Sequence, residues 1–337
     1  MKIAMLAPIA WRTPPRHYGP WELVTSLLTE ALVARGVDVT LFATLDSETA
    51  GKLNGVVPRS YSEDPAIDAK VWEFRHLSYL FERADQFDLI HNQADFPAHA
   101  FSPLTTTPIV TTIHGFSSDR ILPMYAPYQD RVHYVAISAA DRHPELRYAA
   151  TIHHGIPITE FPFDPTGSEN LLFFGRIHPD KGASEAIAAA RASGRALDLY
   201  GIVQDADYHE REVVPAVDGI SIRYHGVTGG QARLDALGQA RALLHLINFD
   251  EPFGLSVIEA MACGTPVIAN RRGSMAEIIV DGVTGFLVDD MAQAIAAIER
   301  VRDIDRASVR QAVVDRFSVD RMADDYVALY RRILASQ

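Results

Sequence analysis

Short apolar runs alternate with stretches of helical periodicity through the first half of the chain. Apolar runs of strand length occupy 2–7, 37–43, 87–91, 108–114, 133–138 and 149–154. After the first run, WELVTSLLTEALVARG places leucine and alanine at helical spacing and ends on Gly36, a typical helix stop. A second helical stretch covers 65–86. Strands that alternate with helices predict parallel βαβ units, which excludes all-β and all-α folds.

The alternation restarts after a segment rich in proline and glycine. Residues 155–170 have no clear periodicity and are predicted to be a linker. Beyond the linker, a helix is predicted over 182–194, and further helices are predicted towards the C-terminus. The remaining strands are predicted at 171–175, 196–201, 220–226, 242–247 and 266–269.

This organisation predicts an α/β protein with two doubly wound, Rossmann-like domains. The N-terminal domain would cover 1–160 and the C-terminal domain 161–317. The last helix, at about 318–337, is expected to cross back and pack on the N-terminal domain. Open α/β sheets bind ligands at the carboxyl ends of their strands, so an interdomain cleft is the expected active site.

Composition narrows the classes of partner and compartment. The net charge of −12 argues against binding to nucleic acid or to an anionic membrane surface. A single cysteine, Cys263, excludes an intramolecular disulfide and suits a reducing compartment. No apolar stretch is long enough to span a bilayer, and the N-terminus lacks the long apolar region of a signal peptide. A cytoplasmic protein is therefore expected, with at most peripheral membrane association, and its oligomeric state is left open.

A glycine, an arginine and a lysine follow the first strand of the second domain. In FFGRIHPDKGASEAI, Gly175 allows a sharp turn, and Arg176 and Lys181 come just before the helix predicted at 182–194. A helix start attracts anions through its free N–H groups and its dipole, and two cations there would form a diphosphate clamp. Because cations without an anion oppose the dipole, phosphate binding is favoured over a merely solvated arginine and lysine.

Two glutamates stand eight residues apart in NFDEPFGLSVIEAMACG. Glu251 lies in the predicted loop, and Glu259 lies in a helix that starts near Gly254, about 7 Å farther along its axis. A carboxylate can accept two hydrogen bonds from a sugar diol. The two acids could therefore hold different parts of an extended ligand whose phosphates lie at the helix start. The alternative is a pair of solvated acids beside a core helix.

These motifs together resemble those of a known enzyme family. EPFGLSVIEAMACGTPVIA is similar to the E-x7-E signature of retaining glycosyltransferase family 4, and GRIHPDKG resembles the Gly-Arg…Lys-Gly element of that family. RGSMAEIIVDGVTGFLV, YGPWELVTSLLTEALVARGVDVTLFA and TTIHG also match, in the right order. The resemblance covers nearly the whole chain and implies the GT-B fold.

The resemblance implies roles for the charged residues and one histidine. Arg176 and Lys181 would bind the donor diphosphate, and Glu259 would bind the nucleotide ribose. Glu251 would hold hydroxyl groups of the donor sugar, and His114 would lie near the reacting sugar. The catalytic set would thus be His114, Glu251, Arg176 and Lys181.

The resemblance also implies backbone contacts. The N–H groups of Phe253, Gly254 and Leu255 would meet the sugar and the phosphates. Gly19 would let the N-terminal loop approach the β-phosphate, but Pro20 stands where the family often has a second glycine. Because proline lacks an N–H group, a phosphate contact from position 20 is not expected.

Other polar residues are assigned structural or surface roles. His91, His153 and His154 fall at or near strand ends, and His154 stands where the family commonly has asparagine. The triplets DAD at 205–207 and DID at 303–305 lie outside the context of a metal motif and are assigned to the surface. No metal site and no cofactor are predicted.

The implied activity is transfer of a sugar from a nucleotide diphosphate to an acceptor hydroxyl, with retention of anomeric configuration and without a metal. UDP-sugars are favoured because much of the family uses them, and GDP-sugars are the rival donors. The acceptor, a carbohydrate or a glycosylated small molecule, is left open. Two alternatives are a GT-B relative with epimerase or phosphorylase chemistry and a non-catalytic subunit that binds sugar nucleotides.

Overall fold

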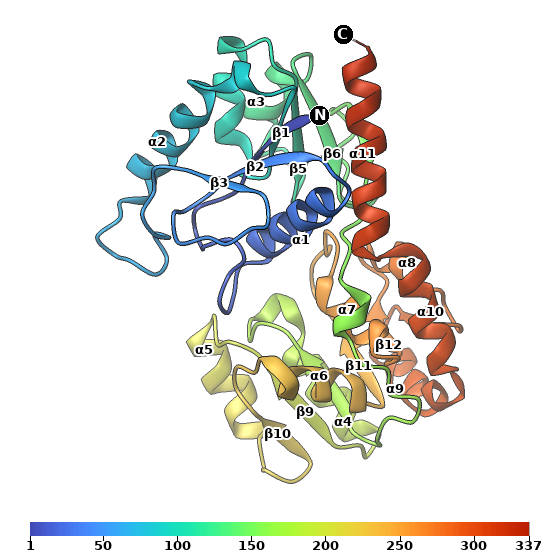
Figure 1. The fold of residues 1–337 in the computed structure, drawn as a ribbon. Helices are drawn as coiled ribbons and strands as arrows, with labels where there is room; N and C mark the ends of the chain where they lie inside the picture. The colour runs from blue at the N-terminus through green and yellow to red at the C-terminus, as the bar shows by residue number, and fades with distance from the viewer. Residues whose placement is uncertain (337) are drawn as a thin grey trace. The chain divides into compact units, whose positions relative to one another are not determined.

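The chain folds into two compact units. The computed structural model describes residues 1–336. The first unit contains Met1–Gly155 and the segment that begins at Val319, and the second contains Ile156–Ser318. The division falls at Gly155, a few residues before the predicted boundary at 160. The C-terminal helix therefore returns to the unit in which the chain began (Figure 1).

The first unit is built on a parallel sheet of seven strands in the order β3-β2-β1-β4-β5-β6-β7. Its strands are β1 (Lys2–Leu6), β2 (Asp38–Phe42), β3 (Lys52–Asn54), β4 (Leu89–Asn92), β5 (Ile109–Ile113), β6 (Val132–Ala136) and β7 (Tyr148–Thr151). The central strands β1, β4 and β5 are buried nearly throughout because helices cover both faces of a parallel sheet.

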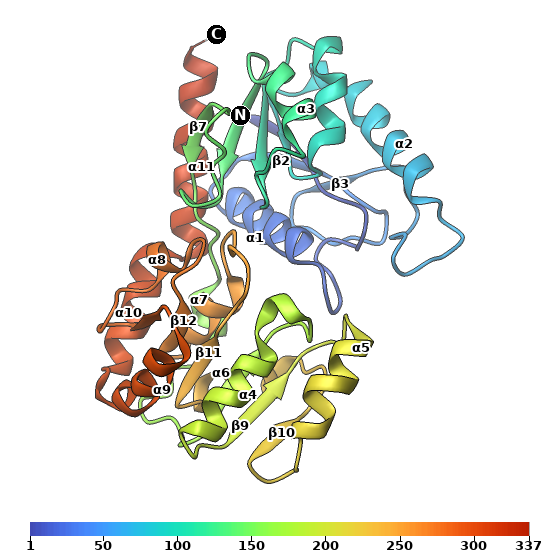
Figure 2. The same ribbon diagram turned by 180° about the vertical axis from the view of Figure 1, so that it is seen from behind.

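The helices of the first unit are α1 (Pro20–Ala34), α2 (Ala69–Phe81), α3 (Leu122–Tyr125) and α11 (Val319–Ala335). One face of α11 is apolar at helical spacing and is buried, whereas its other face is charged. At the end of α1, the Arg35 guanidinium pairs with Asp324 at 2.7 Å and with Asp320 at 3.0 Å. The edge strand β7 lies beside α11 (Figure 2). On β7, Ala149 O accepts a hydrogen bond from Arg332 at 2.7 Å. These contacts fix α11 across the sheet.

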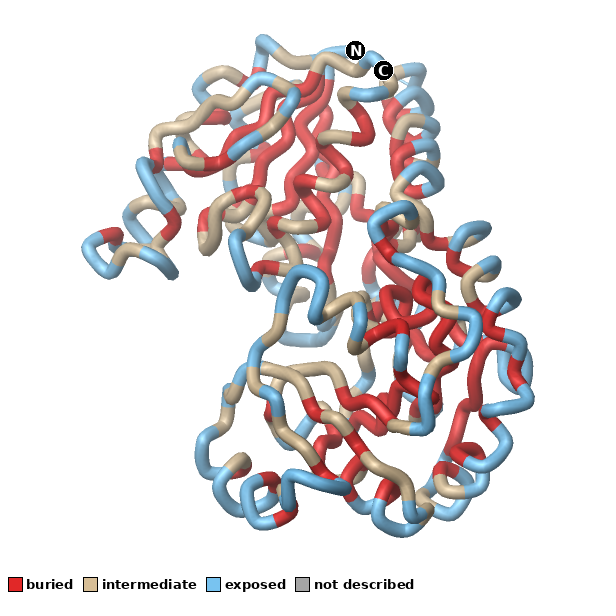
Figure 3. The backbone as a smooth tube through the Cα atoms, turned by 60° about the horizontal axis from the view of Figure 1, so that its bottom comes forward, coloured by how far each residue is buried: buried red, intermediate tan, exposed pale blue. Residues whose placement is uncertain are grey.

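The second unit contains a parallel sheet of six strands in the order β10-β9-β8-β11-β12-β13. Its strands are β8 (Leu171–Phe174), β9 (Leu197–Tyr200), β10 (Ile222–Tyr224), β11 (Ala242–His245), β12 (Val267–Asn270) and β13 (Gly285–Val288). Its helices are α4 (Ala183–Ala192), α5 (Ala206–Tyr208), α6 (Gly230–Gln239), α7 (Leu255–Ala262), α8 (Met275–Ile278), α9 (Met291–Arg300) and α10 (Arg306–Arg316). In both units the buried residues lie in the interior and the exposed residues lie towards the outside (Figure 3). The predicted α/β architecture with two Rossmann-like sheets is confirmed.

The segment predicted to be the linker, residues 155–170, contains the division between the units and packs into the second unit from Ile156 onward. Phe161 is buried, and its carbonyl accepts a hydrogen bond from Arg310 of α10 at 2.7 Å. Arg306 donates to Asp164 O at the same distance. Proline and glycine do break the regular structure here, but the two arginines satisfy the freed carbonyl groups.

Within residues 1–336, no helix is both long enough and apolar enough to cross a membrane.

Candidate active site

Two loops of the second unit meet where its strand order reverses, between β8 and β11. Such a reversal point is the usual ligand-binding crevice of a doubly wound sheet. Asn248 joins the loops, since its backbone N–H donates to Asp180 O at 2.8 Å and its side-chain amide to Pro179 O at 3.2 Å. A Cβ atom on Gly182, whose φ is 73°, would lie 1.9 Å from Leu246 O. Only glycine permits this close approach of the loops.

A largely buried ion pair connects the same two loops. The Lys181 ammonium donates to Glu251 Oε2 at 2.6 Å, and the two side chains are 16% and 12% exposed. His245 Nε2 lies 3.5 Å from the same oxygen, and Lys181 Nζ lies 4.5 Å from the ring centroid of Phe249. Burial acts to raise the pKa of Glu251, but His245 and Lys181 lower it to about 2. Glu251 is therefore an ionised, enclosed carboxylate, and the alternative of a solvated acid is wrong.

The loop from Glu251 to α7 is held by the turn between β12 and α8. Ser274 N donates to Glu251 O at 2.9 Å, and Ser274 Oγ donates to Phe253 O at 2.6 Å. A Cβ atom on Gly273 would lie 2.3 Å from Glu251 O, so these backbones touch. Gly254, at φ 98°, begins α7 without a side-chain cap. The carbonyl groups of Glu251 and Phe253 are thus engaged by the turn. Val257 N and Ile258 N donate to Gly254 O, and the N–H groups that precede them at the helix start suit an anion.

Glu259 lies inside α7 and is only 6% exposed. Its carboxylate forms an ion pair with Arg233 of α6. The Arg233 guanidinium lies 5.9 Å from the ring centroids of Phe161 and Phe174. Glu259 is therefore not a solvated acid either, and Arg233 fixes the direction of its carboxylate. Arg233 was not predicted, because the helix that carries it has no strong apolar periodicity.

Arg176 extends from the loop after β8. Its guanidinium donates a hydrogen bond to the side-chain oxygen of Gln204. The described part of the chain shows no hydrogen bond between Arg176 and Glu251. The structure thus brings Lys181 and Glu251 into contact and places Phe253, Gly254 and Leu255 in the same loop and helix start. Arg176 and Glu259 each have a separate partner.

His114, at the end of β5 in the first unit, is a buried neutral imidazole. Its Nε2 lies 2.7 Å from Gln93 Oε1, and because an amide oxygen only accepts, Nε2 carries the proton. Trp21 stacks on the ring, with centroids 5.2 Å apart and planes at 19°. Burial, together with a smaller effect of His91, lowers the pKa of His114 to about 3. Such an imidazole is a poor general base at neutral pH.

A chain of buried hydrogen bonds links Gln93 to the C-terminal helix. Gln93 Nε2 lies 3.1 Å from His91 Nε2, and His91 Nδ1 lies 2.6 Å from the Tyr330 hydroxyl. Thr112 Oγ1 lies 2.8 Å from His91 Nε2 and 2.7 Å from the Tyr326 hydroxyl. α11 therefore helps to fix the orientation of the His114 partner. The sequence separation of these residues hides the network from any local motif.

Gly19 begins α1 with φ 148°. A Cβ atom there would lie 2.9 Å from Glu22 Oε2, 3.0 Å from Pro15 Cβ and 3.1 Å from Trp11 Cδ1. Glu22 in turn accepts a hydrogen bond from Trp11 N at 3.1 Å. The structure thus gives Gly19 a packing role, and its contact with a phosphate stays a prediction.

No metal site can be assigned within the described part of the chain. Among residues 1–336, no group of three or more His, Cys, Asp or Glu side chains is placed to hold a metal ion. This finding concerns only metal bound by protein side chains. That the reaction proceeds without a metal stays a prediction.

Two protein-family models match the chain, roughly one for each unit. Residues 22–172 match the model described as Glycosyltransferase Family 4, and residues 159–308 match the model described as Glycosyl transferases group 1. The chain belongs to the family 4 type of glycosyltransferase, which has the GT-B fold.

Curated relatives carry glycosyltransferase names. D-inositol 3-phosphate glycosyltransferase of Segniliparus rotundus is 32% identical over 200 residues, which are 52% of this chain and 42% of that protein. The chain thus matches less than half the length of this relative. Glycogen synthase of Mycobacterium tuberculosis is 26% identical over 97% of this chain and 91% of its own length.

Solved structures share the fold over the full chain. AviGT4, a glycosyltransferase involved in avilamycin A biosynthesis, has a TM-score of 0.74 at 24% identity and covers 100% of this chain and 99% of its own. HepE of Anabaena, in complex with UDP and glucose, has a TM-score of 0.74 at 17% identity and covers 100% of both chains. At these identities the likeness shows the GT-B fold alone.

Proposed function

We propose that this protein is a retaining glycosyltransferase that moves a sugar from a UDP-sugar to an acceptor hydroxyl without a metal. The observation that carries the proposal is the buried Lys181–Glu251 pair, which lies at the reversal point of the second sheet. The site pairs a cation suited to phosphate with a carboxylate suited to hydroxyl groups. Its neighbours α4 and α7 both begin at glycines without side-chain caps.

The donor diphosphate would bind at these helix starts. Their N–H groups and dipoles favour negative charge, and Lys181 adds a positive charge from a position just before α4. Arg176 would exchange its bond to Gln204 for a phosphate oxygen. Negative charge grows on the departing diphosphate during transfer, so these fixed donors would stabilise the transition state more than the ground state.

The two glutamates would hold the sugars of the donor. Glu251 is ionised at neutral pH because its pKa is lowered to about 2, so it can only accept hydrogen bonds from sugar hydroxyls. Glu259, one and a half turns into α7, would accept hydrogen bonds from the ribose. Arg233 would keep that carboxylate oriented. The complex of HepE with UDP and glucose supports uridine as the base.

Retention would follow from attack on the same face of the sugar as the leaving group. The leaving phosphate would accept the proton of the acceptor hydroxyl. His114 would shape the site for the reacting sugar, since an imidazole with its pKa lowered to about 3 is uncharged at neutral pH and carries only the Nε2 proton that it donates to Gln93. Its Nδ1 atom, which has no partner among the described residues, could accept a hydrogen bond from the donor sugar.

Product stereochemistry tests this proposal. The enzyme would be incubated with UDP- and GDP-sugars and an acceptor panel, with EDTA or with Mg²⁺, and the anomeric configuration of new glycosides read by NMR. We expect a product with the configuration of the donor, formed equally well in EDTA. An inverted product, or loss of turnover in EDTA with recovery in Mg²⁺, would contradict it. Lys181→Met should abolish turnover, whereas Lys52→Met, at an exposed ion pair, should not.

A further inference from the structure

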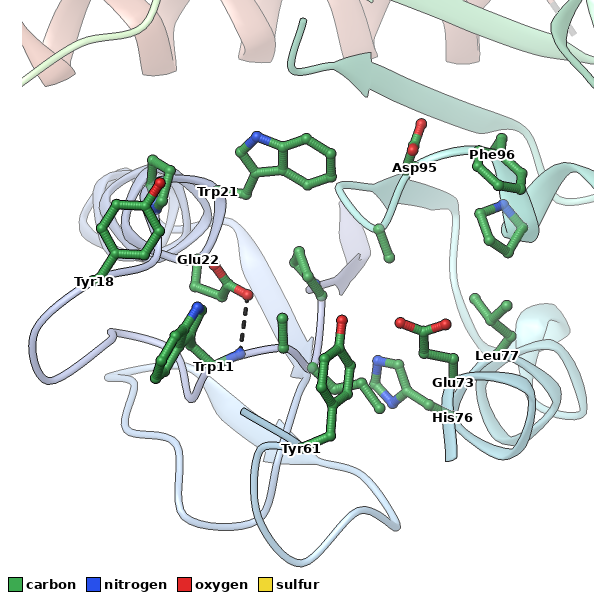
Figure 4. Close-up of a pocket in the computed structure, with 16 residues that line it drawn as sticks. Trp11, Tyr18, Trp21, Glu22, Tyr61, Glu73, His76, Leu77, Asp95 and Phe96 are labelled. Atoms are coloured by element: carbon green, nitrogen blue, oxygen red, sulfur yellow. Dashed lines mark hydrogen bonds between the residues drawn. The ribbon is translucent and has the colours of Figure 1, made fainter. Parts of the chain in front are cut away.

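The first unit contains a cavity of about 480 Å³ at the reversal point of its own sheet. The residues that follow β1 and β4 form two of its sides, and α1 and α2 supply the others (Figure 4). This is the position at which a doubly wound sheet usually binds a ligand. The volume suits one or two sugar rings, since small-molecule pockets typically measure about 300–1,000 Å³.

Aromatic side chains form much of the wall. Trp11, Tyr18, Trp21, Tyr61 and Phe96 all line the cavity. The rings of Trp11 and Tyr18 meet edge to face, with centroids 6.4 Å apart. Tyr18 and Phe96 are 45% and 42% exposed, so their rings are accessible to a ligand. Rings of this kind offer flat apolar faces together with polar edges, as a sugar ring requires.

The charged groups of the cavity are all acidic. Glu22, Glu73 and Asp95 line it, and among its described lining residues there is no lysine or arginine. Glu22 is only 3% exposed. Burial raises the pKa of Glu22 to about 6, although N–H groups of Glu22 and Trp11 act to lower it. A negatively charged ligand in this cavity would be repelled by carboxylates that are already partly removed from water.

Asp95 and His76 add hydrogen-bond acceptors that the fold holds in place. Asp95 adopts φ 62°, a conformation that non-glycine residues seldom adopt, and its carboxylate accepts a bond from the Tyr125 hydroxyl. His76 Nε2 lies 3.0 Å from Ala7 O and must donate to it, which leaves Nδ1 as an acceptor. That buried Nδ1 has no partner among the described residues. These acceptor groups therefore favour a ligand that is rich in hydrogen-bond donors.

We propose that this cavity is the acceptor subsite and that it takes a sugar or cyclitol rich in hydroxyl or amino groups and free of negative charge. The inference rests on the proposed glycosyltransferase activity and adds the substrate class. Glu73 and Asp95 select the ligand by accepting its O–H or N–H donors, and they repel phosphate and carboxylate groups. The chain thus differs in acceptor from its relatives named for D-inositol 3-phosphate.

Tryptophan fluorescence tests the inference. Trp11 and Trp21 line the cavity, and the third tryptophan can be removed by Trp72→Phe. This protein, saturated with UDP, would be titrated with pairs of ligands of similar shape and different charge. The probes are methyl glucoside, glucosamine, glucose 6-phosphate and glucuronic acid, and myo-inositol with its 3-phosphate. We expect the neutral and amine-bearing members to bind at least about tenfold more tightly than the anionic members, a difference of about 1.4 kcal/mol.

A matched pair of variants assigns the effect to the cavity. Glu73→Gln should reduce the difference in affinity between neutral and anionic ligands. Glu145 is an exposed acid of the same unit, and Glu145→Gln should leave that difference unchanged. Anionic ligands that bind as tightly as neutral ones would overturn the inference. Absence of binding by every probe while UDP binds would overturn it too. In either case UDP binding, measured in the same samples, stands as the separate test of the proposed function.

Discussion

Removal of Lys181 should expose how strongly the donor site depends on its buried ion pair. Lys181→Met keeps the length of the side chain and removes the charge that lies 2.6 Å from Glu251 Oε2. The pKa of Glu251 is lowered from 4.5 to about 2, and one pKa unit corresponds to about 1.4 kcal/mol, so the ionised form is favoured by about 3 kcal/mol after the cost of burial, with His245 and Lys181 both contributing. Breaking a buried pair from one side typically costs about 3–5 kcal/mol. We expect a loss within that range at pH 7.

The sign of the pH dependence follows from the lowered pKa. In the wild type, the stabilisation from Glu251 is present above about pH 4.5 and is lost as the pH falls towards 2. In Lys181→Met, Glu251 keeps His245 but loses the lysine charge, so its pKa rises from about 2 and less of the stabilisation from the ionised carboxylate remains at neutral pH. The difference in stability between the two proteins should therefore shrink as the pH falls below 4.5, because Glu251 becomes protonated in the folded variant and in both unfolded chains.

Urea unfolding followed by two signals measures this loss. All three tryptophans, Trp11, Trp21 and Trp72, lie in the first unit, so their fluorescence reports that unit, whereas circular dichroism reports both. The variant should shift the dichroism transition more than the fluorescence transition. Lys52→Met removes a lysine from an exposed pair of similar length and is the matched control. Equal effects of the two substitutions, or a difference that does not shrink in acid, would refute the reasoning.

Further predictions concern the loop, the histidine and the C-terminal helix. Gly182→Ala should lower the melting temperature and weaken UDP binding, because its Cβ would lie 1.9 Å from a backbone oxygen, whereas Gly194→Ala, at φ 65° in open space, should affect stability only modestly and leave UDP binding intact. The His114 ring should show no titration by NMR between pH 5 and 8, since burial lowers its pKa to about 3; a midpoint near 6.5 would contradict this. Tyr330→Phe removes the hydroxyl that lies 2.6 Å from His91 Nδ1, and it should slow turnover with little change in UDP affinity; unchanged turnover would separate α11 from the site.

The sequence predicted those parts of the fold that have strong local patterns. Apolar runs revealed the buried central strands, and the turn residues around Gly182 and Gly254 marked the helix starts. The short edge strand β3 escaped prediction because its residues are polar and only partly buried. β13 was missed because it is a short run inside a motif read for its likeness to the family.

The site was predicted as a set of residues but not as a set of contacts. Lys181 and Glu251 are 70 positions apart, and only the strand order brings their loops together. Arg233 and His245 were missed, since neither stands in a recognisable motif and each acts through a partner carboxylate. Helical and strand periodicity reports burial, whereas partner choice depends on tertiary contacts across the sheet.

Nucleotide binding tests the central claim most directly. Melting temperatures would be measured with UDP, GDP, ADP and TDP in EDTA, for the wild type, for Glu259→Gln and for the exposed control Glu299→Gln. At a ligand concentration of 100 times Kd, binding should stabilise the native state by about 2.7 kcal/mol. We predict that UDP stabilises the wild type and the control but not Glu259→Gln. A donor site at Lys181, Glu251 and Glu259 would be contradicted if no diphosphate raised the melting temperature, or if Glu259→Gln responded as the wild type does.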